Sequence, residues 1–140
     1  MMKNKCFMLL SIPLLLLLPV ISYSFSPHAS GRSIMWGSGG FQYILYENRQ
    51  FFKLDADGIT IQSSGTLFDK KSVKDVFSRL DAIKFDKCFS NNQNGEYFVI
   101  KVISTEGEHQ VAWTQPEELG KKYNYRIPGL YSELMTFVRN

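Results

Sequence analysis

An almost wholly apolar segment near the N-terminus most constrains how this chain folds. It runs from Cys6 to Ile21, follows a short positive stretch, and precedes the small residues Ser22 and Ser24. This succession is the pattern of a secretory signal peptide. We therefore expect residues 1–24 to be a cleaved signal peptide. The exported protein, periplasmic or extracellular, then begins at Phe25.

Three other interpretations of this segment stay open. Cleavage after Ser26 would place Pro27 beside the cut bond. An uncleaved membrane anchor needs about 20 apolar residues, whereas this run is shorter and contains Pro13 and Pro19, which interrupt a helix. A lipid anchor needs a cysteine just behind the apolar run, whereas Cys6 begins it. The sequence thus predicts no stable membrane anchor after signal cleavage.

Removal of the signal leaves a nearly neutral chain with one cysteine. The loss of Lys3 and Lys5 lowers the count of Lys and Arg from 16 to 14, against 13 Asp and Glu. A net charge of +1 gives no electrostatic basis for binding nucleic acid or an acidic membrane. The remaining 116 residues suffice for one hydrophobic core. Cys88 forms no disulfide within the chain, and we expect it to be buried or to pair between molecules.

Turn-forming residues divide the first half of the mature chain. Residues 25–40 predict an irregular leader, with a short edge strand at residues 34–36 as its one apolar interruption. Residues 41–140 predict a single α+β domain that opens with a three-stranded meander. Asp57-Gly58 is typical of a type I′ hairpin turn, whose two central residues both need positive φ.

Apolar residues at helical spacing predict an amphipathic helix after Ser72, its expected N-cap. They are Val73, Val76, Phe77, Leu80 and Ile83. Residues 96–114 predict a second hairpin, and a closing helix is expected from about Pro128. The order β-β-β-α-β-β-α indicates an antiparallel sheet of about five strands, with both helices packed on one face.

The strand expected at residues 96–104 is apolar on both faces. Two sets of side chains alternate along it: Phe98, Ile100 and Val102 on one face, and Tyr97, Val99 and Ile103 on the other. Two helices on one face leave the second face open, so the leader, the segment 115–127 or another molecule must cover it. We predict Tyr97, Val99 and Ile103 as binding residues of an exposed patch.

Aromatic side chains provide further candidates for binding. Tyr123 and Tyr125 lie in a polar segment, and we expect both to be exposed and to bind a partner. Trp113 lies in the middle of a strand, where a core position is favoured.

Three short patterns suggest chemistry without completing a site. Cys88 and His109 are the nearest approach to a nucleophilic pair, although no cysteine-peptidase signature surrounds Cys88. Residues 55–58 resemble the opening of a calcium loop, but Ser64 stands where a bidentate acid is needed. The glycines of residues 38–40 precede a strand instead of the helix of a phosphate-binding loop. We therefore expect no catalytic residue, no metal and no cofactor.

The layout resembles one known family. The segments concerned are Ser38–Phe41, Glu96–Ile100, Val111 with Trp113, and Pro128–Leu134. In this arrangement the chain is similar to emfourin-type inhibitors of thermolysin-like metallopeptidases, although the segment 115–127 departs from their compact pattern. The resemblance implies a protein that blocks a peptidase by surface contact, and it assigns no inhibitory residue.

The sequence as a whole predicts an exported, non-enzymatic domain that binds another macromolecule, and the expected partner is a protein. Two alternatives remain: a small secreted enzyme using Cys88 and His109, and an envelope-associated protein that binds glycans or has a structural role.

Overall fold

The computed structural model describes residues 31–67 and 69–139. The expected signal peptide and its cleavage site lie outside the described residues. The elements are β1 (Ser33–Ser38), β2 (Tyr43–Tyr46), β3 (Gln50–Leu54), β4 (Ile61–Thr66), α1 (Lys70–Ile83), β5 (Phe98–Ser104), β6 (Gly107–Trp113) and α2 (Arg126–Arg139), with short 3-10 helices at Phe85–Lys87 and Pro116–Leu119.

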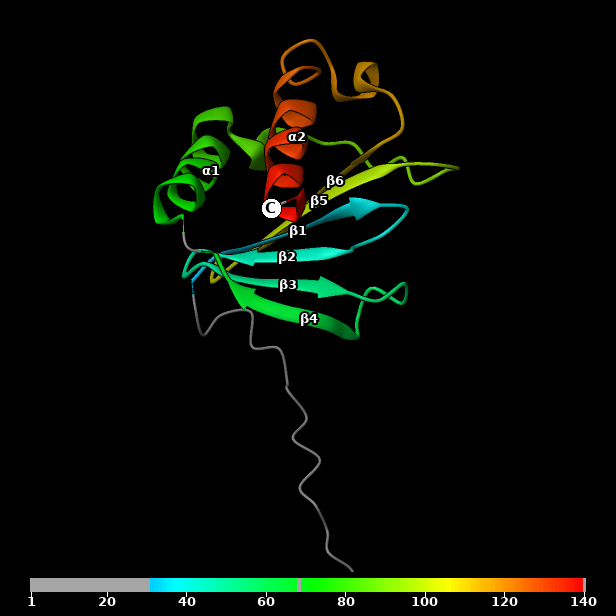
Figure 1. The fold of residues 1–140 in the computed structure, drawn as a ribbon. Coiled ribbons are helices and arrows are strands. Elements are labelled where there is room, and N and C mark those ends of the chain that lie inside the picture. Colours follow the sequence, from blue (N-terminus) through cyan, green and yellow to red (C-terminus); the bar gives the residue numbers. More distant parts are fainter. Residues whose placement is uncertain (1–30, 68, 140) are drawn as a thin grey trace, which may run out of the picture.

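The strands form one antiparallel sheet in the order β4-β3-β2-β1-β5-β6 (Figure 1). The expected α+β class with an antiparallel sheet and two helices is confirmed. The sheet has six strands instead of about five, because the expected leader contributes β1. The order along the chain is therefore β-β-β-β-α-β-β-α.

β1 lies in the middle of the sheet, between β2 and β5, so the prediction of an irregular leader with an edge strand is wrong for this segment. Ile34 and Trp36 face the main core and are fully buried. Two small residues of this strand, Ser33 and Gly37, are also buried in the sheet. A Cβ at Gly37 would lie 2.0 Å from the carbonyl oxygen of Gly40, so the hairpin to β2 closes only around a glycine.

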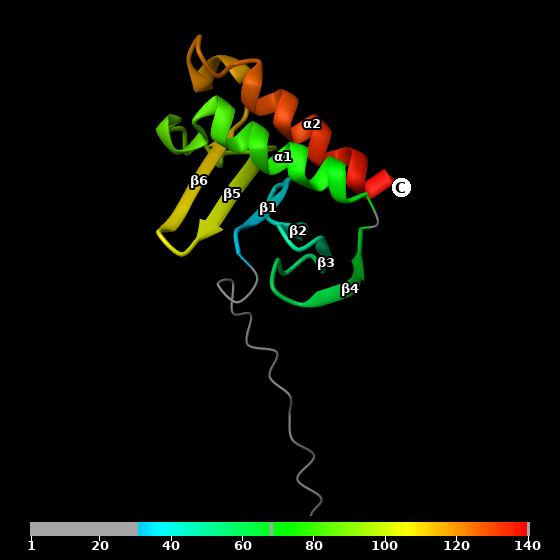
Figure 2. The ribbon, with the colours of Figure 1, turned by 90° about the vertical axis from the view of Figure 1, so that its left-hand side faces the viewer.

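Both helices pack on the same face of the sheet (Figure 2). The five apolar residues expected to line one side of α1 are all buried, as predicted. The helix begins earlier than expected, at Lys70, because the carboxylate of Asp69 accepts the Ser72 backbone N–H at 3.1 Å. Asp69 is therefore the N-cap in place of Ser72. In α2, Ile127, Leu130 and Leu134 are buried against the same core.

The opposite face of the sheet carries a second, smaller core. Ile44, Tyr46 and Leu54 are its buried residues. A register shift after Lys53 interrupts the pairing of β3 with β4, and such bulges bend a strand. In the turn that follows, Gly58 has a φ of +69° but Asp57 is not in the positive-φ region, so the type I′ prediction is wrong.

No helix in the described ranges is both long and apolar enough to cross a bilayer.

Candidate functional site

The expected binding patch on β5 is not an exposed surface. Tyr97, Val99 and Ile103 do lie on the sheet face opposite the helices, but Val99 is 2 % and Ile103 8 % exposed, and Tyr97 is half-buried. Val99 lies between two small residues, Gly37 of β1 and Ala112 of β6. The prediction that these side chains form an open patch is therefore wrong.

Two connections of the chain itself lie on this face. Phe41, just before β2, and Ile59, between β3 and β4, line one hollow together with Tyr97 and Val99. The Lys101 ammonium of β5 lies 5.3 Å from the centre of the Phe41 ring, which places that ring over the same face. The segment 115–127, which was expected as a possible cover, packs on the helical side instead.

The two tyrosines of the segment 115–127 have opposite environments. Tyr123 is 8 % exposed and belongs to the main core, so its expected exposure is wrong. The segment folds back onto the core because Leu119 and Ile127, on either side, are buried there as well. Tyr125 is 84 % exposed, as expected, and makes no stacking contact among the described rings.

Cys88 and His109 are neighbours, but not as a nucleophile and its base. His109 Nε2 lies 2.7 Å from the backbone carbonyl oxygen of Cys88. The imidazole is also held edge-on between Phe85 and Phe89, with ring centres 5.5 and 5.3 Å away. The Cys88 side chain is buried, and that burial raises the pKa of its thiol. A nucleophilic cysteine needs a lowered pKa, so this geometry does not activate the thiol.

The other two short patterns have structural roles. The Asp57 carboxylate accepts the backbone N–H groups of Ile59 at 2.9 Å and Thr60 at 2.8 Å, together with the Thr60 hydroxyl. These bonds lower the pKa of Asp57 and fix the turn before β4. Gly39, at a φ of +69°, donates its N–H to the Tyr97 carbonyl oxygen at 2.8 Å. Among the described residues, no group of three metal-binding side chains comes together.

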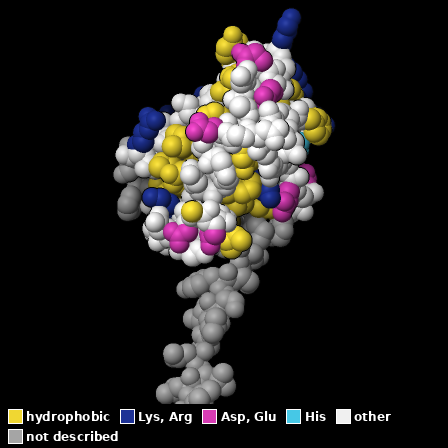
Figure 3. All heavy atoms as spheres, turned by 90° about the vertical axis from the view of Figure 1, so that its right-hand side faces the viewer, with side chains coloured by type: hydrophobic (Ala, Val, Ile, Leu, Met, Phe, Trp, Pro, Cys, Tyr) yellow, Lys and Arg dark blue, Asp and Glu magenta, His cyan; other side chains and the backbone are white. Residues whose placement is uncertain are grey.

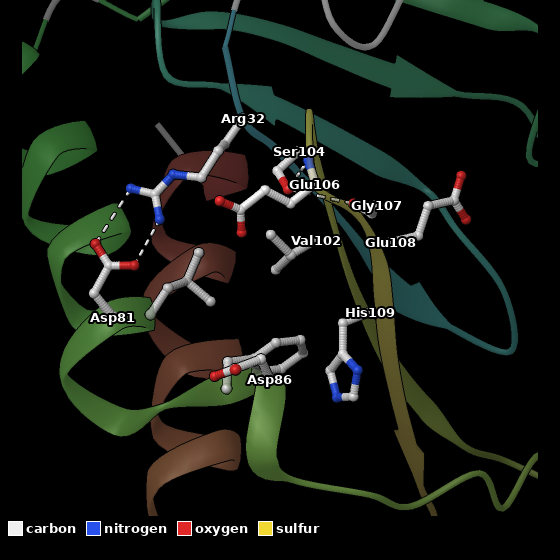
Figure 4. A pocket seen from close by; sticks show the side chains of 11 residues that line it. Arg32, Asp81, Asp86, Val102, Ser104, Glu106, Gly107, Glu108 and His109 are labelled. Atoms are coloured by element: carbon white, nitrogen blue, oxygen red, sulfur yellow. Dashed lines mark hydrogen bonds and ion pairs between the residues drawn. The ribbon is translucent and has the colours of Figure 1, made fainter.

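A hollow of about 520 Å³ separates the end of α1 from the β5–β6 hairpin (Figure 4). Arg32 reaches into it and bonds Asp81 at 2.6 Å and Glu47 at 2.8 Å. These bonds raise the pKa of Arg32, with the Glu47 bond as the largest cause. The other charged groups lining the hollow are acidic, among them Asp86 and Glu106. The hollow therefore offers no unpaired cation to an anionic ligand.

The outer edge of β4 is an exposed edge of the sheet. β4 reads Ile-Gln-Ser-Ser-Gly-Thr, and every residue after Ile61 is exposed. The Leu67 N–H donates to the Arg49 carbonyl oxygen at 2.9 Å. Because bonded and non-bonded pairs alternate in an antiparallel ladder, the backbone groups of Ser64 and Thr66 must then point away from β3.

The other sheet edge is partly occupied by the chain itself. Residues 90–92 run beside β6, where Ala112 donates its N–H to the Ser90 carbonyl oxygen at 2.9 Å and accepts the Asn92 N–H at 3.1 Å. β4 has no such cover from the described residues. The sequence pattern did not predict this surface. A run of Ser, Gly and Thr after a hairpin turn was the one available signal.

Exposed apolar side chains do not gather elsewhere into a broad surface. Among the described residues, the large hydrophobic side chains that are exposed are Ile59, Phe89, Phe98 and Tyr125, which come from four separate segments. On the face drawn in Figure 3, hydrophobic side chains alternate with charged ones.

No protein-family model, no curated protein and no solved structure matches this chain.

Proposed function

We propose that this chain is an exported protein-binding domain that pairs an extended segment of its partner along the free edge of β4. The observation that supports the proposal is an exposed edge strand without any charged residue or proline. Natural sheets usually protect such an edge with lysine, proline or a covering segment. An edge left open in this way is the surface used when a peptide adds a strand to a sheet.

The backbone of β4 supplies the bonds for such pairing. Ser64 and Thr66 each direct one N–H donor and one carbonyl acceptor outward, by the ladder alternation described above. Bonds of this kind contribute affinity with little dependence on the partner's sequence.

The side chains next to the edge supply selectivity. Gly65 lies opposite Phe51 of β3, and a Cβ at Gly65 would meet nothing within 4 Å. Phe51 is half-buried, so its ring is open to an apolar side chain that reaches across the glycine. The partner segment is therefore expected to be extended, with an apolar residue opposite Gly65.

A proline at position 64 tests the proposal. Proline is tolerated on an edge strand where the N–H faces outward, so Ser64→Pro removes one outward donor and obstructs pairing without breaking the ladder to β3. Ser64→Ala is the matched control, because it removes the hydroxyl and keeps the backbone donor. Thermal melting of both variants verifies that each is folded.

The full chain, purified as the cell processes it, is immobilised and incubated with the exported proteins of the producing cell. We expect to capture a protein that binds the parent and the Ser64→Ala variant. Its binding is expected to be lost with the Ser64→Pro variant. Sedimentation of the purified protein shows whether that partner is a second copy. Equal capture by a folded Ser64→Pro variant contradicts the proposal.

The resemblance to emfourin-type inhibitors suggests one class of partner, a thermolysin-like metallopeptidase. Residual activity of thermolysin, titrated with the purified protein, tests this narrower proposal. Inhibition that Ser64→Pro abolishes places the peptidase on β4, whereas inhibition that Ser64→Pro leaves intact assigns it to another surface.

A further inference from the structure

An apolar cavity of about 230 Å³ lies on the sheet face opposite the helices. Its walls come from four strands and from the connection between β3 and β4. The apolar lining residues are Met35, Ile44, Tyr46, Leu54, Ile59 and Ile103. Ile59 is 79 % exposed, so the cavity reaches the surface beside this residue. No charged side chain lines it.

One polar side chain in this wall has no hydrogen-bond partner in the part of the chain that the structure describes. Ser33 also lines the cavity, is 1 % exposed, and its hydroxyl oxygen makes no hydrogen bond within the described residues. Its neighbours across the strands are Tyr46 and Ile103. A buried hydroxyl without a partner is unfavourable, and native proteins rarely keep one. An alanine in this position would avoid that cost, so the hydroxyl points to a ligand.

We infer that this cavity binds one small neutral molecule that has an apolar body and a single hydroxyl group. A cavity of about 150 Å³ lined by apolar side chains holds benzene, so this larger cavity accepts a ring with a short alkyl chain. The absence of charge in the lining favours a neutral ligand, because a buried unpaired charge is strongly unfavourable. The Ser33 oxygen is itself buried, so the side chains beside it shift when the ligand's hydroxyl bonds it, and the ligand's apolar body contacts the aliphatic walls.

This site is independent of the proposed pairing on β4. None of its lining residues belongs to that strand. Failure of one proposal therefore leaves the other standing, and the two experiments measure different surfaces.

The test compares two probes that differ by one hydroxyl group, 4-ethylphenol and ethylbenzene. The full chain, purified as the cell processes it, is labelled with nitrogen-15 and titrated with each probe by NMR. We expect saturable shifts of the amides around Ser33, Ile59 and Ile103. The phenol is expected to bind roughly 5- to 10-fold more tightly, as one net hydrogen bond provides.

Three variants test whether the probes bind in this cavity and whether the Ser33 hydroxyl causes the preference for the phenol. Ser33→Ala is expected to bind both probes with equal affinity and to melt at the parent's temperature or higher. Ile59→Ser removes an exposed apolar wall and is expected to weaken both probes. Phe89→Ser is the matched control, because Phe89 is equally exposed at 79 % and lies outside the cavity. The inference is overturned if the parent shows no saturable binding, or if a preference for the phenol persists in Ser33→Ala.

Discussion

The imidazole of His109 forms a hydrogen bond with the backbone of Cys88, with Nε2 2.7 Å from the carbonyl oxygen of that residue. The bond ties β6 to the segment that leaves α1. Phe85 and Phe89 hold the ring edge-on from the same segment. His109 therefore works as a clamp between the helical layer and the sheet, and the thiol beside it lies within the core.

The buried thiol predicts a pH dependence of stability. Burial raises the pKa of Cys88 in the folded protein above its unfolded value of about 8.5. The unfolded state then ionises first as the pH rises. The stabilisation is complete below about pH 8.5 and is lost as the pH rises through the folded pKa.

We therefore expect the parent to lose stability above about pH 8.5 more steeply than Cys88→Ala, since buried tyrosines titrate equally in both proteins. Urea denaturation at a series of pH values measures this difference. Parallel pH profiles would contradict the prediction.

The apolar side of α1 predicts large losses on truncation. Phe77 and Leu80 are 3 % and 4 % exposed in the main core. Replacing either by alanine removes buried contacts and leaves a cavity, which is expected to cost roughly 2–5 kcal/mol. Urea unfolding of each variant checks this value. Ser78→Ala, on the exposed side of the same helix, is the control and should unfold like the parent.

Val99→Lys separates a buried position from an interface. Because Val99 is 2 % exposed between Gly37 and Ala112, the longer and charged side chain of lysine disturbs the packing around this position. We expect this variant to lose several kcal/mol, on the order of the 1–3 kcal/mol or more that overpacking and unpaired charge each produce. A variant that melts like the parent but fails to associate with a partner would instead support the prediction that Val99 belongs to an exposed binding patch.

The two strand glycines Gly37 and Gly65 make a matched pair. A methyl group on Gly37 would lie 2.0 Å from the Gly40 carbonyl oxygen, whereas one on Gly65 would meet nothing within 4 Å. Gly37→Ala is therefore expected to destabilise the protein by about 3 kcal/mol or more, and Gly65→Ala to leave stability unchanged or slightly raised. Thermal melting of both variants is the measurement. Similar melting temperatures would mean that the hairpin between β1 and β2 adjusts freely.

The N-terminus of the exported protein is a separate prediction. We expect N-terminal sequencing to begin at Phe25, because Ser22 and Ser24 flank the expected cleavage site. An intact chain starting at Met1 and recovered from membranes would show that the apolar segment is an anchor.

Periodicity predicted the parts of this fold that depend on neighbouring residues. The spacing of the apolar residues in α1 identified its buried side, and alternation along β5 separated Ile100 from Val99 correctly. Both patterns repeat within a few residues, so the local chain contains the necessary information.

The missed parts depend on contacts between distant segments. Ser33 and Gly37 look like loop residues, and only their neighbours in β2 and β5 make them part of a central strand. Val99 was placed on the correct face but with the wrong exposure, because Gly37 and Ala112, from distant parts of the chain, pair on either side of it. The local sequence does not show which distant segments will surround a given side chain. The Ser33 hydroxyl, which has no hydrogen-bond partner among residues 31–67 and 69–139, could likewise be recognised only once its surroundings in the fold were known.

The central position of β1 also determines when this chain can fold. Ser33 pairs with Ile103, although the whole meander and α1 lie between them in the sequence. Closing so long a loop costs chain entropy before any bond repays it, and folds rich in distant pairings form slowly. During synthesis from the N-terminus, β1 can pair with β2 on one side, but its other side has no partner strand until β5 has been made. The first strand made is thus among the last to be paired on both sides.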